Sequence, residues 1–598
     1  MALVIALTAG LVSGPAAGAS GASEASDAGA AGRQLPPEYR NPLRLTLPDG
    51  LTAASCADPD VTRGEGGEWY LYCTSDRGTD EPGGFEPGLL PIYRSTDLVN
   101  WTYVRAAVEN RPSYAVADAG LWAPDIVKVG REYRLYYAVS DTTLPGAGAA
   151  VGVAVGSSPA GPFTVSDRPV VEPQPNPDNP RFRRSTIDPE VIVSNGQAYM
   201  FYGGFGGGIS ARRLSADGLS TDAASERPIA IGDRYEGSYL VKRGGWWYLM
   251  MSSTNCCNGP LTGYTVFAAR SKSLLGPYRD RTGASVLDSR VGGTPVVTQN
   301  GNSWVGVGHN SMVTDLAGQD WMVYHGIKEA DPYYRGAVGY TKRPALIDPV
   351  DWVGGWPTVR RGAGSSDRAQ PGPVTRPDQR QGYRPQPVRD PRLGRTIAAD
   401  RFTDPHLDGW TWVRRPDSST YRAGNGSLRW QTQAGDIQPP SASPLASILT
   451  RPAPAGDYAV TATVSVDVPA DRSVHNFVQG GLVIYNDDTS YLKLVAVSIG
   501  VTRQTEFGKR VAPQPGYPAY GNAVVGVQGA SQTHLRIVAK ACGPVSCYTA
   551  YTSPDGHRWV RGATWRQAAT DHTRIGLISM GGTGFTTTFS DVRVNALR

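Results

Sequence analysis

The sequence of 598 residues has no segment that is both long and apolar enough to span a bilayer. No helical periodicity of any length is evident in it. Charged residues make up only 19% of the chain, and the formal net charge of +5 is small for this length. No two cysteines have the CxxC spacing of a zinc site. These absences exclude a membrane-spanning protein and a zinc module, and we expect no membrane and no nucleic-acid partner.

The chain is instead rich in glycine and proline, with 72 and 47 residues, which is typical of a turn-rich, all-β secreted protein. The N-terminus agrees with secretion. An apolar run from Ala2 to Val12, followed by Ala17-Gly-Ala19, resembles the core and cleavage site of a signal peptide. We therefore expect residues 1–30 to be a signal peptide and disordered N-terminus of an extracellular protein, with a disordered Ala-rich tail as the alternative.

The six cysteines also fit an oxidising compartment. Two pairs lie where a hairpin or a turn brings cysteines together, namely Cys56 with Cys73 and Cys542 with Cys547. Cys256 and Cys257 are adjacent in the sequence. The alternative, that all six are reduced and buried, stays open.

A glycine turn followed by an aromatic-rich strand recurs five times along the first 360 residues. The copies are separated by roughly 45–75 residues, a spacing typical of propeller repeats. They begin at Gly67, Gly130, Gly196, Gly245 and Gly318.

Each repeat can be aligned on one aromatic residue of this strand, namely Trp69, Tyr133, Tyr199, Trp247 and Trp321. Eleven positions earlier stand Asp58, Trp122, Asp188, Glu236 and Asn310, with His309 beside the last. Equivalent positions of the inner strands surround the central channel of a propeller at one height. This register predicts one pocket with three carboxylates, a tryptophan and a His-Asn pair. For any single aspartate next to proline, a turn role is the alternative.

The composition changes after the repeats. Residues 361–395 are rich in Pro, Arg, Gln and Gly without periodicity, which predicts an extended linker. Residues 396–598 contain short alternating strands separated by turns such as Asn425-Gly426, which predicts an antiparallel sandwich. The expected organisation is a propeller over 45–360, the linker, and a β-sandwich over 396–598.

Several carboxylates around one pocket, without a Ser-His-Asp order or a Gly-rich phosphate loop, indicate glycosidic chemistry. One acid must protonate the departing oxygen, and another must activate water or attack the sugar. A third carboxylate nearby raises the pKa of the proton donor by like-charge repulsion.

Five motifs in this order resemble glycoside hydrolase family 43, a family of five-bladed propellers. They are Cys56-Ala-Asp-Pro-Asp-Val61, Leu121-Trp-Ala-Pro-Asp-Ile126, Ser185-Thr-Ile-Asp-Pro-Glu-Val191, Tyr235-Glu-Gly-Ser-Tyr239 and Gly308-His-Asn-Ser311. The resemblance implies that Asp58 is the general base, Asp188 the pKa modulator and Glu236 the general acid, and that Trp122 and Asn310 bind substrate. Asp125 lies three residues beyond the ring position, so we expect it to be a structural acid.

A narrower resemblance is to the arabinan-cleaving members. Its residues are Asn255-Cys-Cys-Asn-Gly259, Ala269-Arg-Ser-Lys-Ser-Leu-Leu-Gly-Pro-Tyr278 and Asp320-Trp-Met-Val-Tyr-His325. In those relatives the histidine of the Gly-His-Asn motif contacts a bound metal, usually calcium, so His309 is the candidate metal ligand. A hydrogen-bonded channel histidine without metal is the alternative. His325 follows an aromatic strand, and we expect a packing role for it.

The second domain resembles the concanavalin-like jelly roll found behind some family 43 domains, through residues such as Phe402-Thr-Asp-Pro-His-Leu-Asp-Gly-Trp410. It would either bind carbohydrate or brace the propeller. The whole chain then predicts a secreted, inverting, monomeric enzyme that cleaves α-L-arabinofuranosyl linkages in plant cell-wall arabinan or arabinoxylan. The alternatives are a β-xylosidase of the same fold and a non-catalytic carbohydrate-binding propeller.

Overall fold

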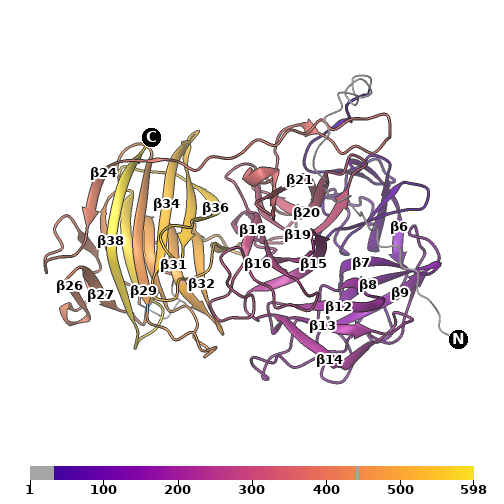
Figure 1. The fold of residues 1–598 in the computed structure, drawn as a ribbon, viewed down its shortest axis with the longest axis horizontal. Coiled ribbons are helices and arrows are strands. Elements are labelled where there is room, and N and C mark those ends of the chain that lie inside the picture. The colour runs from indigo at the N-terminus through magenta and orange to yellow at the C-terminus, as the bar shows by residue number, and fades with distance from the viewer. Residues whose placement is uncertain (1–32, 439–443) are drawn as a thin grey trace, which may run out of the picture.

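The computed structural model describes residues 33–438 and 444–598, and the predicted signal peptide lies outside them. The described chain forms two all-β bodies that lie side by side (Figure 1). Its helices are three single 3-10 turns, η1 (Gly259–Leu261), η2 (Arg360–Gly362) and η3 (Ser418–Thr420). None of the described helices has the length and apolar character needed to cross a membrane.

The first body is a propeller of five antiparallel blades, as predicted. Each blade begins with its inner strand. The first blade contains β3 (Asp60–Arg63), β4 (Trp69–Tyr72), β5 (Leu89–Ser95) and β6 (Asn100–Val108), with β2 (Arg44–Thr46) parallel to β6. The second contains β7 (Leu121–Val129), β8 (Glu132–Val139), β9 (Ala150–Gly156) and β10 (Thr164–Val165). The third contains β11 (Glu190–Ser194), β12 (Gln197–Gly204), β13 (Gly208–Leu214) and β14 (Thr221–Ala230).

The last two blades share one parallel contact, Thr265 with Val307, between their strands. The fourth contains β15 (Tyr235–Arg243), β16 (Trp246–Ser253), β17 (Thr265–Ser271) and β18 (Thr294–Val297). The fifth contains β19 (Trp304–Thr314), β20 (Asp320–Lys328), β21 (Ala345–Val353) and β22 (Trp356–Val359).

The repeated aromatic residues fill the spaces between neighbouring blades. Trp69 of the first blade and Trp321 of the fifth belong to one apolar cluster, and Trp321 is fully buried. Trp247 of the fourth blade packs in a cluster that Tyr199 of the third blade contacts. An aromatic side chain at this position buries a large apolar area on both neighbours, which explains why the same residue type recurs in each repeat.

The chain before the first blade closes the ring against the fifth blade. The Leu43 N–H donates to the Ala345 carbonyl at 2.8 Å, and the Cys56 N–H donates to the Arg343 carbonyl at 3.0 Å. A disulfide joins Cys56 to Cys73, next to β4 of the first blade. The first and last blades are therefore held together by main-chain hydrogen bonds.

Residues 361–395, predicted to be an extended linker, contain little regular structure, but they pack against the propeller as far as Tyr383. The two-residue strand β23 (Gln370–Pro371) pairs with β1 (Glu38–Tyr39). The buried Ser366 N–H donates to Asp348 Oδ2 at 3.1 Å, and Tyr383 Oη donates to Asp351 Oδ2 at 2.7 Å. In Figure 1 the segment then crosses to the far side of the second body.

The second body consists of two facing antiparallel sheets. One sheet contains β24 (Leu393–Asp400), β26 (Tyr421–Gly424), β27 (Ser427–Gln431), β29 (Tyr458–Val466), β34 (Thr533–Cys542), β35 (Val545–Ser553), β36 (Val560–Gln567) and β38 (Thr586–Leu597). The other contains β25 (Thr411–Val413), β28 (Ile448–Pro452), β30 (Gln479–Asp487), β31 (Ser490–Ile499), β32 (Thr502–Arg510), β33 (Tyr520–Val524) and β37 (Arg574–Met580).

Alternate residues of both sheets point into one shared core, such as Val460 of β29 and Leu482 of β30. Trp430 is fully buried in this core, and Trp410 is 9% exposed. Trp412 packs on Trp430 with ring centroids 5.0 Å apart. These tryptophans therefore serve the core of the sandwich rather than an exposed carbohydrate-binding face.

The sandwich packs tightly against the third and fourth blades. Arg234 Nη1 donates to Gln504 Oε1 at 2.7 Å, and Gln504 Nε2 donates to the Asp233 carbonyl at 2.8 Å. Val501 and Val524 of the sandwich belong to the same apolar cluster as Trp247 of the propeller. The two bodies are therefore joined by a packed, hydrogen-bonded interface.

The main chains of the two bodies also come into close contact at Gly521. A Cβ atom at Gly521 would lie 1.8 Å from the Leu261 carbonyl oxygen of η1. We expect Gly521→Ala to destabilise the protein by about 2 kcal/mol or more, because this overlap is with backbone that must move. Thermal unfolding measures the change. Gly394→Ala on β24 is the control. Its new methyl group would lie 3.0 Å from the Ala596 carbonyl oxygen of β38, a much smaller overlap away from the interface. Equal melting temperatures for the two variants would contradict the expected close contact.

Candidate active site

Each blade has one left-handed residue in or just before its inner strand, within one position of the sequence register. The residues with this conformation are Asp58, Ala123, Asp188, Gly237 and His309, with φ between 46° and 58°. Non-glycine residues avoid this conformation unless the surroundings hold them in it. Its recurrence in all five blades shows that the sequence register marks a structural repeat at the channel mouth.

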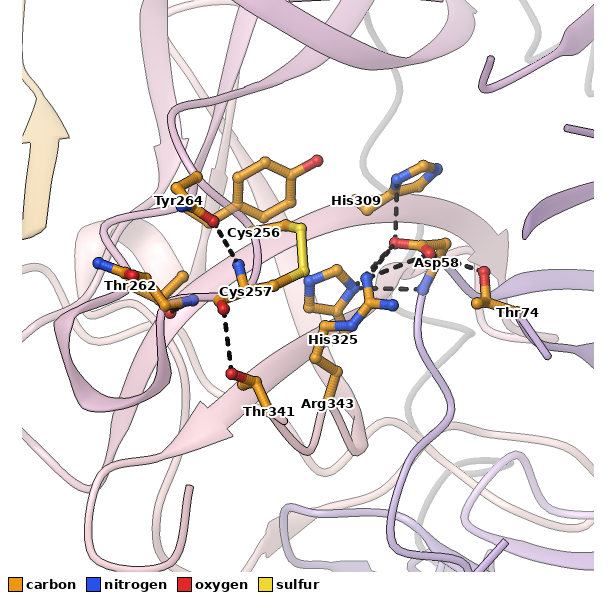
Figure 2. The surroundings of a disulfide bond; sticks show 12 residues. Asp58, Thr74, Cys256, Cys257, Thr262, Tyr264, His309, His325, Thr341 and Arg343 are labelled. Carbon is orange, nitrogen blue, oxygen red and sulfur yellow. Dashed lines mark hydrogen bonds and ion pairs between the residues drawn. A yellow bond between two sulfur atoms is a disulfide. The ribbon is translucent and has the colours of Figure 1, made fainter. Parts of the chain in front are cut away.

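Asp58 is buried and bonded on both carboxylate oxygens. Thr74 Oγ1 donates to Oδ2 at 2.7 Å, and Arg343 Nη1 donates to Oδ1 and Oδ2 at 3.1 and 3.2 Å (Figure 2). His309 Nδ1 lies 3.2 Å from Oδ1. Burial alone would raise the pKa of Asp58, but Arg343 and His309 hold it well below its usual value. Asp58 is therefore ionised.

Asp188 and Glu236 are held next to each other. Asp188 Oδ2 accepts the Gly237 N–H at 3.0 Å, and Glu236 Oε1 accepts the Tyr264 hydroxyl at 2.7 Å. Burial and the charge of Asp58 raise the pKa of Asp188 to about 6. Burial and the charge of Asp188 raise the pKa of Glu236 to about 7. Glu236 therefore keeps a proton to higher pH than an ordinary glutamate.

Of the remaining predicted residues, His309 is in contact with the carboxyl groups of Asp58 and Asp188. The His309 N–H donates to Ser252 Oγ at 2.8 Å. Burial would lower the pKa of His309, but the carboxylates of Asp58 and Asp188 raise it to about 9. Asn310 is buried next to Met250, and Trp122 is 39% exposed. Trp122 thus has an accessible aromatic face. The next residue, Ala123, donates its N–H to the same Thr74 hydroxyl that bonds Asp58.

Three residues that the sequence register did not find complete the site. Arg343 lies between β20 and β21, outside the register, and pairs with Asp58. Tyr264 precedes β17 and bonds Glu236. His325, expected to serve packing, accepts the Asp58 N–H on Nδ1 at 3.2 Å and stacks on Tyr264 with a ring distance of 5.5 Å. Burial lowers the pKa of His325 to about 4, so its ring is neutral.

A second set of acids lies two or three residues further along the inner strands. Each accepts a main-chain N–H from the next blade: Asp60 from Ile126 at 3.0 Å, Asp125 from Val191 at 3.0 Å and Glu190 from Leu240 at 3.3 Å. Burial raises the pKa of all three carboxyl groups. Asp125 is thus a structural acid, as expected from its place in the sequence.

Few free donors surround His309 for the expected calcium ion. Within residues 33–438 and 444–598, no group of three or more His, Cys, Asp or Glu side chains could hold a metal ion. Calcium prefers oxygen ligands, and the oxygens of Asp58 nearest to His309 are engaged by Arg343 and Thr74. A calcium ion at His309 would therefore take most of its ligands from water.

A five-bladed propeller with an ionised and a protonated carboxyl group at its channel mouth defines a glycoside-cleaving enzyme. The chain belongs to the glycosyl hydrolases family 43, whose family model matches residues 51–357. This confirms the family that the five motifs indicated.

Two curated relatives are similar to the propeller half. The extracellular exo-α-(1→5)-L-arabinofuranosidase ArbA of Cellvibrio japonicus is 32% identical over 339 residues, which cover 52% of this chain and 89% of the relative. The extracellular endo-α-(1→5)-L-arabinanase 1 of Bacillus subtilis is 30% identical over 313 residues, which cover 50% of this chain and 86% of the relative.

Among solved structures, the α-L-arabinanase of Cellvibrio cellulosa in complex with arabinohexaose is 30% identical, with a TM-score of 0.43, and covers 52% of this chain and 96% of that chain. The family 43 protein BlXynB of Bacillus licheniformis is 20% identical with a TM-score of 0.41, and covers 94% of this chain and 100% of that chain.

The hydrogen bond from Tyr264 gives a test of Glu236 as the titrating acid. The Tyr264 hydroxyl stabilises the ionised form of Glu236 and so lowers its pKa. Tyr264→Phe should therefore move the alkaline limb of the pH profile of kcat/KM upward, by about 0.5–1 pH unit. Tyr239→Phe is the control, because its hydroxyl donates to the Met312 carbonyl. An alkaline limb that stays in place in Tyr264→Phe would show that another group titrates there.

Proposed function

We propose that this protein is an extracellular, inverting glycosidase that hydrolyses α-L-arabinofuranosyl linkages of plant cell-wall arabinan. Membership of family 43 and the printed activities of the two curated relatives support this substrate. Both relatives are described as extracellular, and the three disulfides of this chain suit that location.

The opposite pKa shifts of Asp58 and Glu236 carry the proposal. At neutral pH Glu236 keeps a proton for the departing glycosidic oxygen, because burial and Asp188 raise its pKa to about 7. Asp58 is ionised under the same conditions, so it accepts a proton from the attacking water. Glycoside hydrolysis requires one carboxyl group in each of these two states. Membership of family 43 supports the inverting course.

The other site residues support this division of roles. Arg343 and Thr74 hold the carboxylate of Asp58 in one orientation, which fixes the direction from which water is activated. The N–H of Gly237 donates to Asp188 and so places the modulating charge next to the acid. Trp122 supplies an apolar face on which a sugar ring packs.

A release assay on a panel of substrates tests the substrate class. We expect arabinose or short arabino-oligosaccharides from linear arabinan, and faster hydrolysis of an aryl α-L-arabinofuranoside than of an aryl β-xyloside. Proton NMR of the first product should show inverted anomeric configuration. The length of the products separates exo from endo action. Faster xyloside hydrolysis, or a product of retained configuration, would overturn the proposal.

Substitution of the two carboxyl groups tests their roles. Glu236→Gln should lower kcat/KM on arabinan by a factor of about 10³, because proton donation to a poor leaving group is lost. The loss on an aryl arabinofuranoside with a good leaving group should be much smaller. Asp58→Asn should lose activity on both substrates. Glu109→Gln, on the exposed surface, is the control. If Glu236→Gln loses equal activity on both substrates, Glu236 is not the acid.

Calcium at His309 is part of the proposal. It requires that His309 bind the ion as a neutral imidazole, in place of the imidazolium that pairs with Asp58 without metal. A chelator should then lower the melting temperature and the activity, and added calcium should restore both, because an ion bound only by the folded state stabilises that state. Magnesium serves as the comparison ion, and His309→Ala should abolish the response to calcium. A metal-free preparation with unchanged activity and melting temperature would contradict a calcium site.

A further inference from the structure

The loop between β16 and β17 carries a disulfide between neighbours in the sequence. Cys256 and Cys257 are joined with an S–S distance of 2.05 Å. Cys257 is exposed and Cys256 is partly exposed. The bond closes a small ring with the peptide bond between the two residues, so it presents two sulfur atoms on a fixed piece of backbone.

This disulfide lies beside the catalytic carboxyl groups. Its surroundings include Asp58, His309 and Arg343 (Figure 2). On one side, Ser252 at the end of β16 holds the His309 N–H. On the other side, Tyr264 at the start of β17 holds Glu236.

The loop is also tied to the fifth blade at the segment that carries Arg343. Thr341 Oγ1 donates to the Cys257 carbonyl at 3.1 Å and accepts the Gly259 N–H at 3.1 Å. The disulfide therefore lies at the junction of the fourth and fifth blades. In a ring of five blades, this junction is opposite the second blade, which carries Trp122.

Hydrogen bonds hold the loop that carries the disulfide. Asn255 Oδ1 accepts the Cys257 N–H at 2.8 Å, and the Asn258 N–H donates to Thr262 Oγ1 at 2.8 Å. Asn258 Nδ2 reaches the sandwich, where it donates to the Tyr520 carbonyl at 2.8 Å. Hydrogen bonds from both domains thus hold an exposed, apolar pair in a defined place at the site.

We infer that the Cys256–Cys257 disulfide is one wall of the sugar-binding pocket, opposite Trp122, and packs on the C–H groups of the bound arabinofuranosyl ring. Sulfur is polarisable and apolar, so it makes dispersion contacts with such a surface. The identity of the sugar rests on the proposed function. The contact is made by substrate and transition state alike, so it contributes to KM rather than to kcat.

The double variant Cys256→Ala/Cys257→Ala tests this contact on an aryl α-L-arabinofuranoside. We expect KM to rise about fivefold to tenfold, with kcat changed less than about twofold. The matched control is Cys542→Ala/Cys547→Ala, which removes the disulfide of the β34–β35 hairpin in the sandwich. A folded Cys256→Ala/Cys257→Ala variant with unchanged KM overturns the inference.

A second measurement tests the same contact if the Cys256→Ala/Cys257→Ala variant does not fold. In the Cys542→Ala/Cys547→Ala protein, a phosphine reductant should open Cys256–Cys257 before Cys56–Cys73, which is almost fully buried. Once two thiols per chain titrate under native conditions, KM should rise, and reoxidation should restore it. If KM is unchanged when two thiols per chain titrate, and the protein still hydrolyses the arabinoside, the inference about the disulfide is wrong but the proposed function stands. Absence of arabinoside hydrolysis in the unsubstituted, oxidised protein overturns the proposed function itself, and the wall for arabinose with it.

Discussion

Repulsion among three carboxyl groups in one buried channel is the constraint on which the site depends. Two unit charges 4 Å apart at a protein surface interact by about 4 kcal/mol, so three ionised acids cannot share this space without compensation. The chain compensates one of them only. Arg343 and His309 both face Asp58, so the first negative charge stays on Asp58. The pKa of Asp188 rises to about 6 and that of Glu236 to about 7, so Glu236 is the last of the three to lose its proton. The division into base and acid follows from where the cations lie.

Arg343 and Tyr264, a cation and a hydrogen-bond donor of the site, come from segments outside the inner strands. Arg343 stands in the connection between two outer strands, and Tyr264 stands at the end of the loop that carries the vicinal disulfide. That loop is in turn held by a carbonyl of the sandwich. The second domain therefore takes part in shaping the site through main-chain contacts, although its tryptophans are used in its own core.

The repeated register predicted the propeller and the ring of Asp58, Asp188 and Glu236, because a strand period and a glycine turn are local properties of the sequence. The register did not predict the roles of Arg343, His325 and Tyr264. Each of these residues contacts a carboxylate only after a distant segment of the chain has folded against it. A similar limit applies to residues 361–395. Their Pro- and Arg-rich composition indicated an extended chain, but Ser366 and Tyr383 show that burial depends on partners that composition does not reveal.

The second set of acids shows how the blades tolerate substitutions in their neighbours. Asp60, Asp125 and Glu190 each bond the main chain of the next blade rather than one of its side chains. The contact therefore makes no demand on which side chain the neighbour carries at that position. Proline is the exception, because it has no N–H to donate. The contact therefore permits other apolar residues at Ile126, Val191 and Leu240. A substitution by proline at any of them would leave a buried carboxyl group without its hydrogen-bond donor.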